Sequence, residues 1–140
     1  AGALSVICGS SAGLLDALTP FDVLSFTGSA ETAAVIRSHA AVAQRSVRVN
    51  IEADSLNSAL LDPSATADSE AFKLFVAEVV REMTVKSGQK CTAIRRAFVP
   101  RALYDAAAEA IGAKLAKTTV GNPRNEAVRM GALVSRAQFN

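Results

Sequence analysis

The fold of this sequence is constrained most strongly by two short apolar segments that lie on either side of a helical segment. Residues 22–29 (DVLSFTGS) form an apolar run that ends in a Gly-Ser turn, as a buried strand does. Residues 30–44 have the spacing of a helix, and residues 46–53 then alternate apolar and polar side chains like a strand. The apolar face of that helix comprises Ala33, Ile36 and Ala40. Strand, helix and strand in short succession predict an α/β fold with a parallel sheet.

A long amphipathic helix follows in the second half of the sequence. Residues 69–88 begin with Ser69, a good helix cap, and end with Gly88, a good helix stop. The apolar stripe of this helix consists of Phe72, Phe75, Val76, Val79 and Met83. We expect a strand at 93–99 and a second helix over residues 100–117.

Both ends of the sequence lie inside structural patterns. Residues 4–8 (LSVIC) predict a short buried strand in which Cys8 is an inert core residue, and residues 14–18 predict a helical turn. The sequence stops soon after Ser135 and Gln138, which have the spacing of a capping box at the start of a helix. We therefore expect a segment of a longer protein.

The composition argues against several classes of protein. The chain has 140 residues, half of them hydrophobic, which suits a compact domain or part of a larger one. Its net charge is only +2 and it has no Trp, so we expect no nucleic-acid partner. No apolar run approaches the roughly 18 residues of a membrane span. The two distant cysteines, Cys8 and Cys91, predict free thiols in a reducing compartment, so we expect a cytoplasmic protein.

Cys91 lies in a cationic segment, residues 85–96 (VKSGQKCTAIRR). A cysteine attacks as its thiolate, and neighbouring cationic side chains lower the pKa of a thiol. Lys86 and Lys90 therefore favour a nucleophile, whereas the carboxyl end of the preceding helix opposes thiolate formation. These residues alone leave two interpretations open, a catalytic cysteine or a packed or idle thiol.

Two further candidates lie at the ends of the first two predicted strands. Glu52 falls at a strand end, with Asp54 two residues later, and such ends face the crevice where α/β proteins bind ligands. A solvent-facing position on an edge strand is the simpler alternative for Glu52. The stretch FTGS at 26–29 joins a strand to a helix, where free backbone N–H groups can bind an anion.

The remaining polar residues carry weaker signals. His39, the single histidine, lies in a predicted helix, and nothing marks it as a base. Cysteine and histidine never cluster with ligand spacing, so we expect no metal site. The stretch GSSAG at 9–13 is a turn that lacks the spaced glycines of a dinucleotide fingerprint.

Taken in order, four motifs closely resemble the aldehyde dehydrogenase superfamily. They are FTGS at 26–29, Glu52 at a strand end, GQKC at 88–91, and VGNP followed by MGALVS at 120–135. The resemblance covers essentially the whole chain, and the ordered set is more specific than any single motif. It implies that residues 1–53 end a Rossmann-like dinucleotide-binding domain and that residues 54–140 begin the α/β catalytic domain.

The resemblance also implies a role for each candidate. Cys91 would be the nucleophile that attacks an aldehyde carbon, and its backbone N–H would help to hold the oxyanion. Glu52 would be the general base that activates water, or a thiol, in the second half of the cycle. The residues lining the NAD or NADP site would be Phe26, Thr27, Gly28, Ser29 and Ala53. No metal is implied.

One departure from the common family pattern points to a branch. Most relatives continue with Leu-Gly-Gly after the base, whereas this chain has EADSLN at 52–57. Together with residues 80–96, this stretch resembles the CoA-linked semialdehyde dehydrogenases of aerobic aromatic degradation. The resemblance implies a CoA-thioester semialdehyde as substrate, a preference for NADP and a homo-oligomer.

Two alternatives stay open. With half of a cofactor site, the polypeptide by itself is expected to be a non-catalytic α/β module. The second alternative is a cysteine-dependent acyl-transfer enzyme without a nicotinamide cofactor, with Glu52 or His39 as the base.

Overall fold

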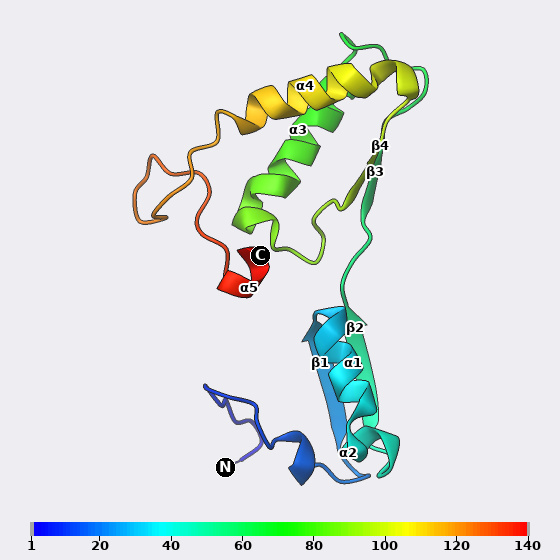
Figure 1. Cartoon of the computed structure of the whole chain (residues 1–140), viewed down its shortest axis with the longest axis vertical. Coiled ribbons are helices and arrows are strands. Elements are labelled where there is room, and N and C mark those ends of the chain that lie inside the picture. Colours follow the sequence, from blue (N-terminus) through cyan, green and yellow to red (C-terminus); the bar gives the residue numbers. More distant parts are fainter. Residues whose placement is uncertain (1, 140) are drawn as a thin grey trace. The chain divides into compact units, whose positions relative to one another are not determined.

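The computed structural model describes residues 2–139 and contains both helices and strands (Figure 1). The chain divides into two compact units, Ala1–Asp54 and Ser55–Asn140. Each unit has its own two-stranded parallel sheet and its own helices. The predicted α/β class is therefore confirmed. No helix within residues 2–139 is long and apolar enough to cross a membrane.

The first unit is built around one parallel strand pair, as the sequence predicts. Its elements are η1 (Leu15–Ala17), β1 (Val23–Gly28), α1 (Ala30–Ser38), α2 (Ala40–Ala43) and β2 (Arg48–Ala53). The register places Thr27 opposite Glu52 and Gly28 opposite Ala53. Helices α1 and α2 form the crossover between the two strands (Figure 1). The carboxyl ends of both strands therefore meet at the same edge of the sheet.

The helix predicted over residues 30–44 is interrupted at His39. The backbone of His39 is extended, with ψ 142°, and its Nδ1 accepts the backbone N–H of Ala41 at 3.2 Å. The His39 Nε2 lies 3.3 Å from a carboxylate oxygen of Asp16. Because the break rotates the second helix, Ala41 is buried and the predicted Ala40 is exposed.

The prediction of a buried strand at residues 4–8 is wrong. Within residues 2–139 this segment pairs with no other strand. Leu4 and Val6 are 87% and 83% exposed, and Cys8 is exposed rather than a core residue. A strand needs a neighbour to receive its backbone hydrogen bonds and to cover its side chains. The apolar pattern is present here without such a neighbour.

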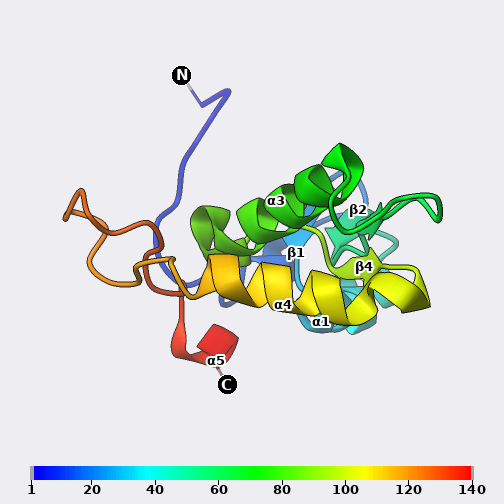
Figure 2. The ribbon, with the colours of Figure 1, turned by 90° about the horizontal axis from the view of Figure 1, so that it is seen from above.

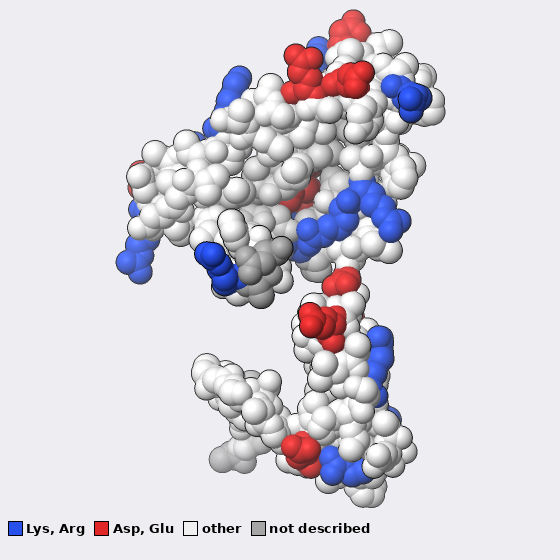
Figure 3. Space-filling view, in the orientation of Figure 1, with Lys and Arg blue, Asp and Glu red and all other residues white. Residues whose placement is uncertain are grey.

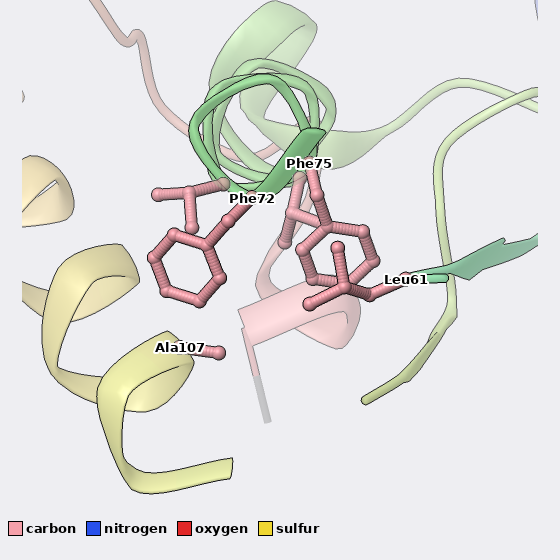
Figure 4. Close-up of a cluster of buried hydrophobic side chains, with 6 residues drawn as sticks. Leu61, Phe72, Phe75 and Ala107 are labelled. Atoms are coloured by element: carbon pink, nitrogen blue, oxygen red, sulfur yellow. The ribbon is translucent and has the colours of Figure 1, made fainter. Parts of the chain in front are cut away.

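The second unit packs helix α3 against helix α4 and a short parallel sheet (Figure 2). Its elements are β3 (Ser58–Leu60), α3 (Glu70–Thr84), η2 (Val85–Gly88), β4 (Arg96–Phe98), η3 (Arg101–Leu103), α4 (Tyr104–Leu115) and α5 (Arg136–Phe139). Strand β3 was not predicted, and β4 is shorter than the predicted strand at 93–99. Figure 4 shows the core between these elements, which consists of Leu61, Phe72, Phe75, Val76, Val79 and Ala107.

Helix α3 follows the predicted amphipathic pattern, except that one predicted apolar residue is exposed and a charged residue is buried instead. Ser69 caps the helix, since its side-chain oxygen accepts the backbone N–H of Phe72 at 3.2 Å. Of the predicted stripe, only Met83 lies outside the core, with 45% of its surface exposed. Glu82 takes its place and is only 7% exposed. A charged side chain thus ends the buried face of α3.

Helix α3 also ends earlier than predicted, at Thr84 instead of residue 88. Three consecutive residues of η2 have positive φ: Lys86 at 51°, Ser87 at 56° and Gly88 at 70°. Left-handed backbone is unusual for residues with a Cβ atom, and it turns the chain sharply away from the helix axis. The segment that carries Cys91 therefore leaves the end of α3 through a tight reversal.

Replacing Gly88 by alanine in the full-length protein is expected to lower the free energy of unfolding by about 1–2 kcal/mol, because φ is positive there. A Cβ atom at this position would also lie 3.2 Å from the carbonyl oxygen of Met83. Denaturant unfolding measures the change. Gly112→Ala is the control, because Gly112 lies inside α4 with open space around it and should gain roughly 0.5–1 kcal/mol. Equal effects of the two substitutions would contradict the prediction.

Candidate active site

Cys91 is exposed in a turn between η2 and β4. The turn is closed by a hydrogen bond from the Ala93 N–H to the Lys90 carbonyl oxygen, at 3.1 Å. Ala93 is buried, with 1% of its surface exposed, and anchors the far end of the turn. The thiol is thus carried on an open turn whose flanking backbone is held in place.

Asn57, the residue before β3, fixes this turn from a distant part of the sequence. Its side-chain nitrogen donates to the carbonyl oxygens of Cys91, at 2.6 Å, and Ala93, at 3.1 Å. Its own carbonyl oxygen accepts the backbone N–H groups of Arg95 and Arg96, at 2.8 and 3.2 Å. Asn57 was not predicted from the sequence, because an asparagine before a strand carries no signal that distinguishes it from other turn residues.

The structure brings two of the motifs noted in the sequence together. The Gln89 side-chain oxygen accepts the backbone N–H of Val134 at 2.9 Å. The Ser87 hydroxyl donates to the carbonyl oxygen of Gly131 at 2.8 Å. The GQKC segment at 88–91 therefore lies beside the MGALVS segment at 130–135, although about 40 residues separate them in the sequence.

Lys90, one of the cationic side chains expected to favour a thiolate, is engaged by a carboxylate. Its ammonium group lies 2.8 Å from Oε1 of Glu82 and forms an ion pair with that carboxylate. The hydrogen bond from Lys90 holds the pKa of Glu82 below its usual value, although burial acts in the opposite direction. Figure 3 shows basic side chains gathered along the segment between η2 and β4. Among these basic side chains, Lys90 has its charge compensated by the Glu82 carboxylate.

Glu52 and the predicted cofactor residues lie together at the carboxyl edge of the first sheet. Glu52 is exposed and stands opposite Thr27 in the strand register, and Ala53 stands opposite Gly28. The Phe26 ring covers Gly28 so closely that a Cβ atom there would lie 2.5 Å from the ring. The structure therefore places the predicted base and the predicted cofactor residues on one open edge.

The start of α1 is less available to a ligand than predicted. The Ser29 side-chain oxygen accepts the N–H of Thr32 at 3.2 Å, which confirms Ser29 as a helix cap. The carboxylate of Asp54, a residue with φ 56°, accepts the N–H of Ala30 at 3.1 Å. The Asp54 N–H in turn donates to the Gly28 carbonyl oxygen at 3.1 Å. The Ala30 and Thr32 N–H groups, expected to be free for an anion, are already bonded within the chain.

The two predicted catalytic residues belong to different units, Glu52 to the first and Cys91 to the second. Within residues 2–139, no group of His, Cys, Asp and Glu side chains is arranged to hold a metal ion. His39 has both ring nitrogens engaged inside the first unit, with Ala41 and Asp16. Its position is that of a structural residue at a helix break.

The comparison with protein families decides the classification. The model described as "Aldehyde dehydrogenase family" matches residues 1–140. The chain belongs to the aldehyde dehydrogenase family. Over 137 residues it is 58% identical to 3,4-dehydroadipyl-CoA semialdehyde dehydrogenase of Aromatoleum evansii, a match that covers 98% of this chain and 27% of that protein. The resemblance noted in the sequence is thereby confirmed.

Solved aldehyde dehydrogenases share the fold of this segment. A crystal structure of betaine aldehyde dehydrogenase from Staphylococcus aureus, in complex with NAD+, is similar to it with a TM-score of 0.70 and 26% sequence identity. The similarity covers 83% of this chain and 22% of that one. The chain thus spans about a quarter of the length of these aldehyde dehydrogenases.

Proposed function

We propose that the full-length protein is an NAD(P)-dependent aldehyde dehydrogenase that works through a covalent intermediate on Cys91. The observation that carries the proposal is the exposed thiol on a turn that Asn57 anchors on both sides. A nucleophile has to be accessible to its substrate and also held in a fixed position. Membership of the aldehyde dehydrogenase family supports this role for the thiol.

In the first step, the Cys91 thiolate forms a carbon–sulfur bond with the aldehyde carbon, and the carbonyl electron pair moves to oxygen. The product is a thiohemiacetal with a negatively charged oxygen. Within residues 2–139 the backbone N–H of Cys91 donates to no acceptor, so it is free to stabilise that oxygen. Asn57 holds the Cys91 carbonyl and thereby fixes the orientation of the peptide group that follows.

When bound, NAD(P)+ would be the acceptor for the hydride that leaves the thiohemiacetal carbon, and a thioester on Cys91 would remain. The residues proposed to hold the cofactor are Phe26, Thr27, Gly28, Ser29 and Ala53. They fit a dinucleotide because they lie at the exposed carboxyl edge of a parallel sheet, where α/β proteins bind such ligands. The bonded Ala30 N–H restricts where a phosphate can dock at the start of α1.

In the last step, Glu52 takes a proton from water as the water oxygen attacks the thioester carbon. The carbon–sulfur bond then breaks, the thiolate of Cys91 leaves, and the carboxylic acid is released. An exposed carboxylate without an ion-pair partner within residues 2–139 is suited to this exchange of protons.

The name of the relative from Aromatoleum evansii supports a CoA-linked semialdehyde as the substrate, and the other details that follow are part of our proposal. The substrate is a CoA-thioester semialdehyde from aromatic ring cleavage, and NADP is the preferred cofactor. The first unit belongs to the dinucleotide-binding domain and the second to the catalytic domain. The full-length protein is a cytoplasmic homo-oligomer. The two free cysteines of this chain are compatible with a reducing compartment.

Steady-state rates of the full-length protein test this function. We expect reduction of the nicotinamide with a CoA-linked semialdehyde, a higher kcat/KM with NADP+ than with NAD+, and slower turnover of a free aldehyde of the same chain length. The change in nicotinamide absorbance measures each rate. No reduction with any aldehyde would contradict the proposal. Thioester cleavage without a nicotinamide would favour the acyl-transfer alternative instead.

A further inference from the structure

A second feature of the Cys91 segment is the buried ion pair that joins it to helix α3. Glu82 lies in the last turn of α3, and Lys90 directly precedes the thiol. The Lys90 and Glu82 side chains are 20% and 9% exposed, and their charged atoms lie 2.8 Å apart. Loosely held surface ion pairs contribute little to stability, whereas removing one partner of a buried pair leaves an uncompensated charge. This pair is of the second kind.

Lys90 is also fixed through its backbone. Its carbonyl oxygen accepts the N–H of Ala93, at 3.1 Å, and a guanidinium nitrogen of Arg95, at 3.4 Å. The side chain and the carbonyl of one residue therefore tie the turn to α3 and close it around Cys91. Asn57 holds the opposite side of the same turn. The thiol lies between two anchors that come from different parts of the sequence.

The charges around Glu82 favour the pair with Lys90. Arg81 also approaches the same oxygen, but at 3.4 Å, and it shares its charge with Glu78 at 3.4 Å. The other oxygen of Glu82 is buried and has no hydrogen-bond partner within the described residues. A buried carboxylate with one short and one longer cationic contact depends mainly on the short one. Lys90 is thus the principal partner of Glu82.

We propose that Glu82 is a positioning residue for the Cys91 nucleophile and acts through Lys90. The ion pair holds the turn against the end of α3, and it compensates the charge of the residue that directly precedes Cys91. The proposal uses the role of Cys91 proposed above, but its main measurement, the alkylation of Cys91, does not require turnover. A failure of the positioning role of Glu82 can therefore be distinguished from a failure of the catalytic role of Cys91.

The test is a double-mutant cycle in the full-length protein with Glu82→Gln, Lys90→Gln and both together. The rate of alkylation of Cys91 by iodoacetamide is followed across pH by mass spectrometry, with exposed Cys8 as the reference thiol in the same sample. We expect Glu82→Gln to move the midpoint of alkylation to lower pH, because the Lys90 charge is no longer compensated. We expect kcat to fall roughly 10- to 100-fold while the KM for the dinucleotide changes less than about twofold.

Two matched controls isolate the pair. Glu78→Gln removes a carboxylate of the same helix, whose ion-pair partner in the described part of the chain is Arg81, and Lys114→Gln removes an exposed ammonium group of α4 in the same unit. Both controls should alkylate like the unchanged protein. Relative to the unchanged protein, the fall in kcat of the double variant should be much smaller than the product of the two single-variant falls, as is expected of coupled residues. Additive effects, or alkylation of both single variants at the control rate, would overturn the proposal.

The test still gives a result if one of the variants fails to fold. Circular dichroism and thermal unfolding identify a variant that has lost its structure. If Glu82→Gln is such a variant, the comparison of Lys90→Gln with Lys114→Gln is sufficient for the test. A difference in the pH midpoint of Cys91 alkylation between these two supports the proposal, and equal midpoints overturn it.

Discussion

Replacing Cys91 by alanine in the full-length protein is expected to abolish aldehyde-dependent reduction of the nicotinamide. The loss should be on the order of 10³- to 10⁶-fold in kcat, because no covalent intermediate can form without the nucleophile. Binding of the dinucleotide should persist, since the proposed cofactor residues belong to the first unit. Stopped-flow absorbance measures turnover, and titration of nicotinamide fluorescence measures binding.

The second cysteine supplies the control for this experiment. Cys8 is exposed like Cys91, but it lies in a segment without strand pairing and carries no proposed role. The same substitution at Cys8 should leave kcat within about twofold of its starting value, as surface changes usually have small effects. Normal turnover by the Cys91→Ala variant would refute the mechanism.

Replacing Glu52 by glutamine is expected to slow release of the acid while leaving formation of the thioester intact. General-base catalysis contributes typically 10²- to 10⁴-fold, so steady-state kcat should fall by about that factor. The first turnover should still produce a burst of reduced nicotinamide, because hydride loss precedes the step that needs the base. Intact-protein mass spectrometry should detect the acyl group on Cys91.

Glu31→Gln is the matched control for Glu52. Glu31 is an exposed carboxylate in the first turn of α1, in the same unit as Glu52. Its replacement removes the same charge without touching the strand edge, so both the burst and the steady state should be preserved. A Glu52→Gln variant that loses the burst, or that keeps its steady-state rate, would remove Glu52 from the role of deacylation base.

Local sequence patterns were sufficient to predict the helices and strands whose pattern lies within the element itself. The strands at 22–29 and 46–53 and the cap at Ser69 are confirmed, because apolar alternation and a capping hydroxyl act over a few residues. The segment at 4–8 has the same apolar pattern, but in the part of the chain that the structure describes no strand pairs with it, and the prediction is wrong there. A pattern shows what a segment is able to do and not whether a neighbour is present.

The features around the thiol depend on contacts between distant residues and were not predicted. Asn57 lies 34 residues from Cys91, and no local rule connects them. The burial of Glu82 could have been predicted from the sequence, because Glu82 continues the spacing of Phe72, Phe75 and Val79 on the buried face of α3. A charged residue in an apolar stripe needs a partner, and Lys90 follows within the next turn of chain. Met83 was assigned to this face instead, because methionine is more apolar than glutamate.

The Asp54 carboxylate has a consequence for how the dinucleotide is retained. The first turn of a helix offers a partial positive charge, and in α1 a side chain of the same polypeptide already neutralises part of it. A pyrophosphate at this turn gains little from the helix and is repelled by a neighbouring anion. At the proposed cofactor site, binding of a dinucleotide is therefore expected to depend on cationic or apolar contacts outside this turn.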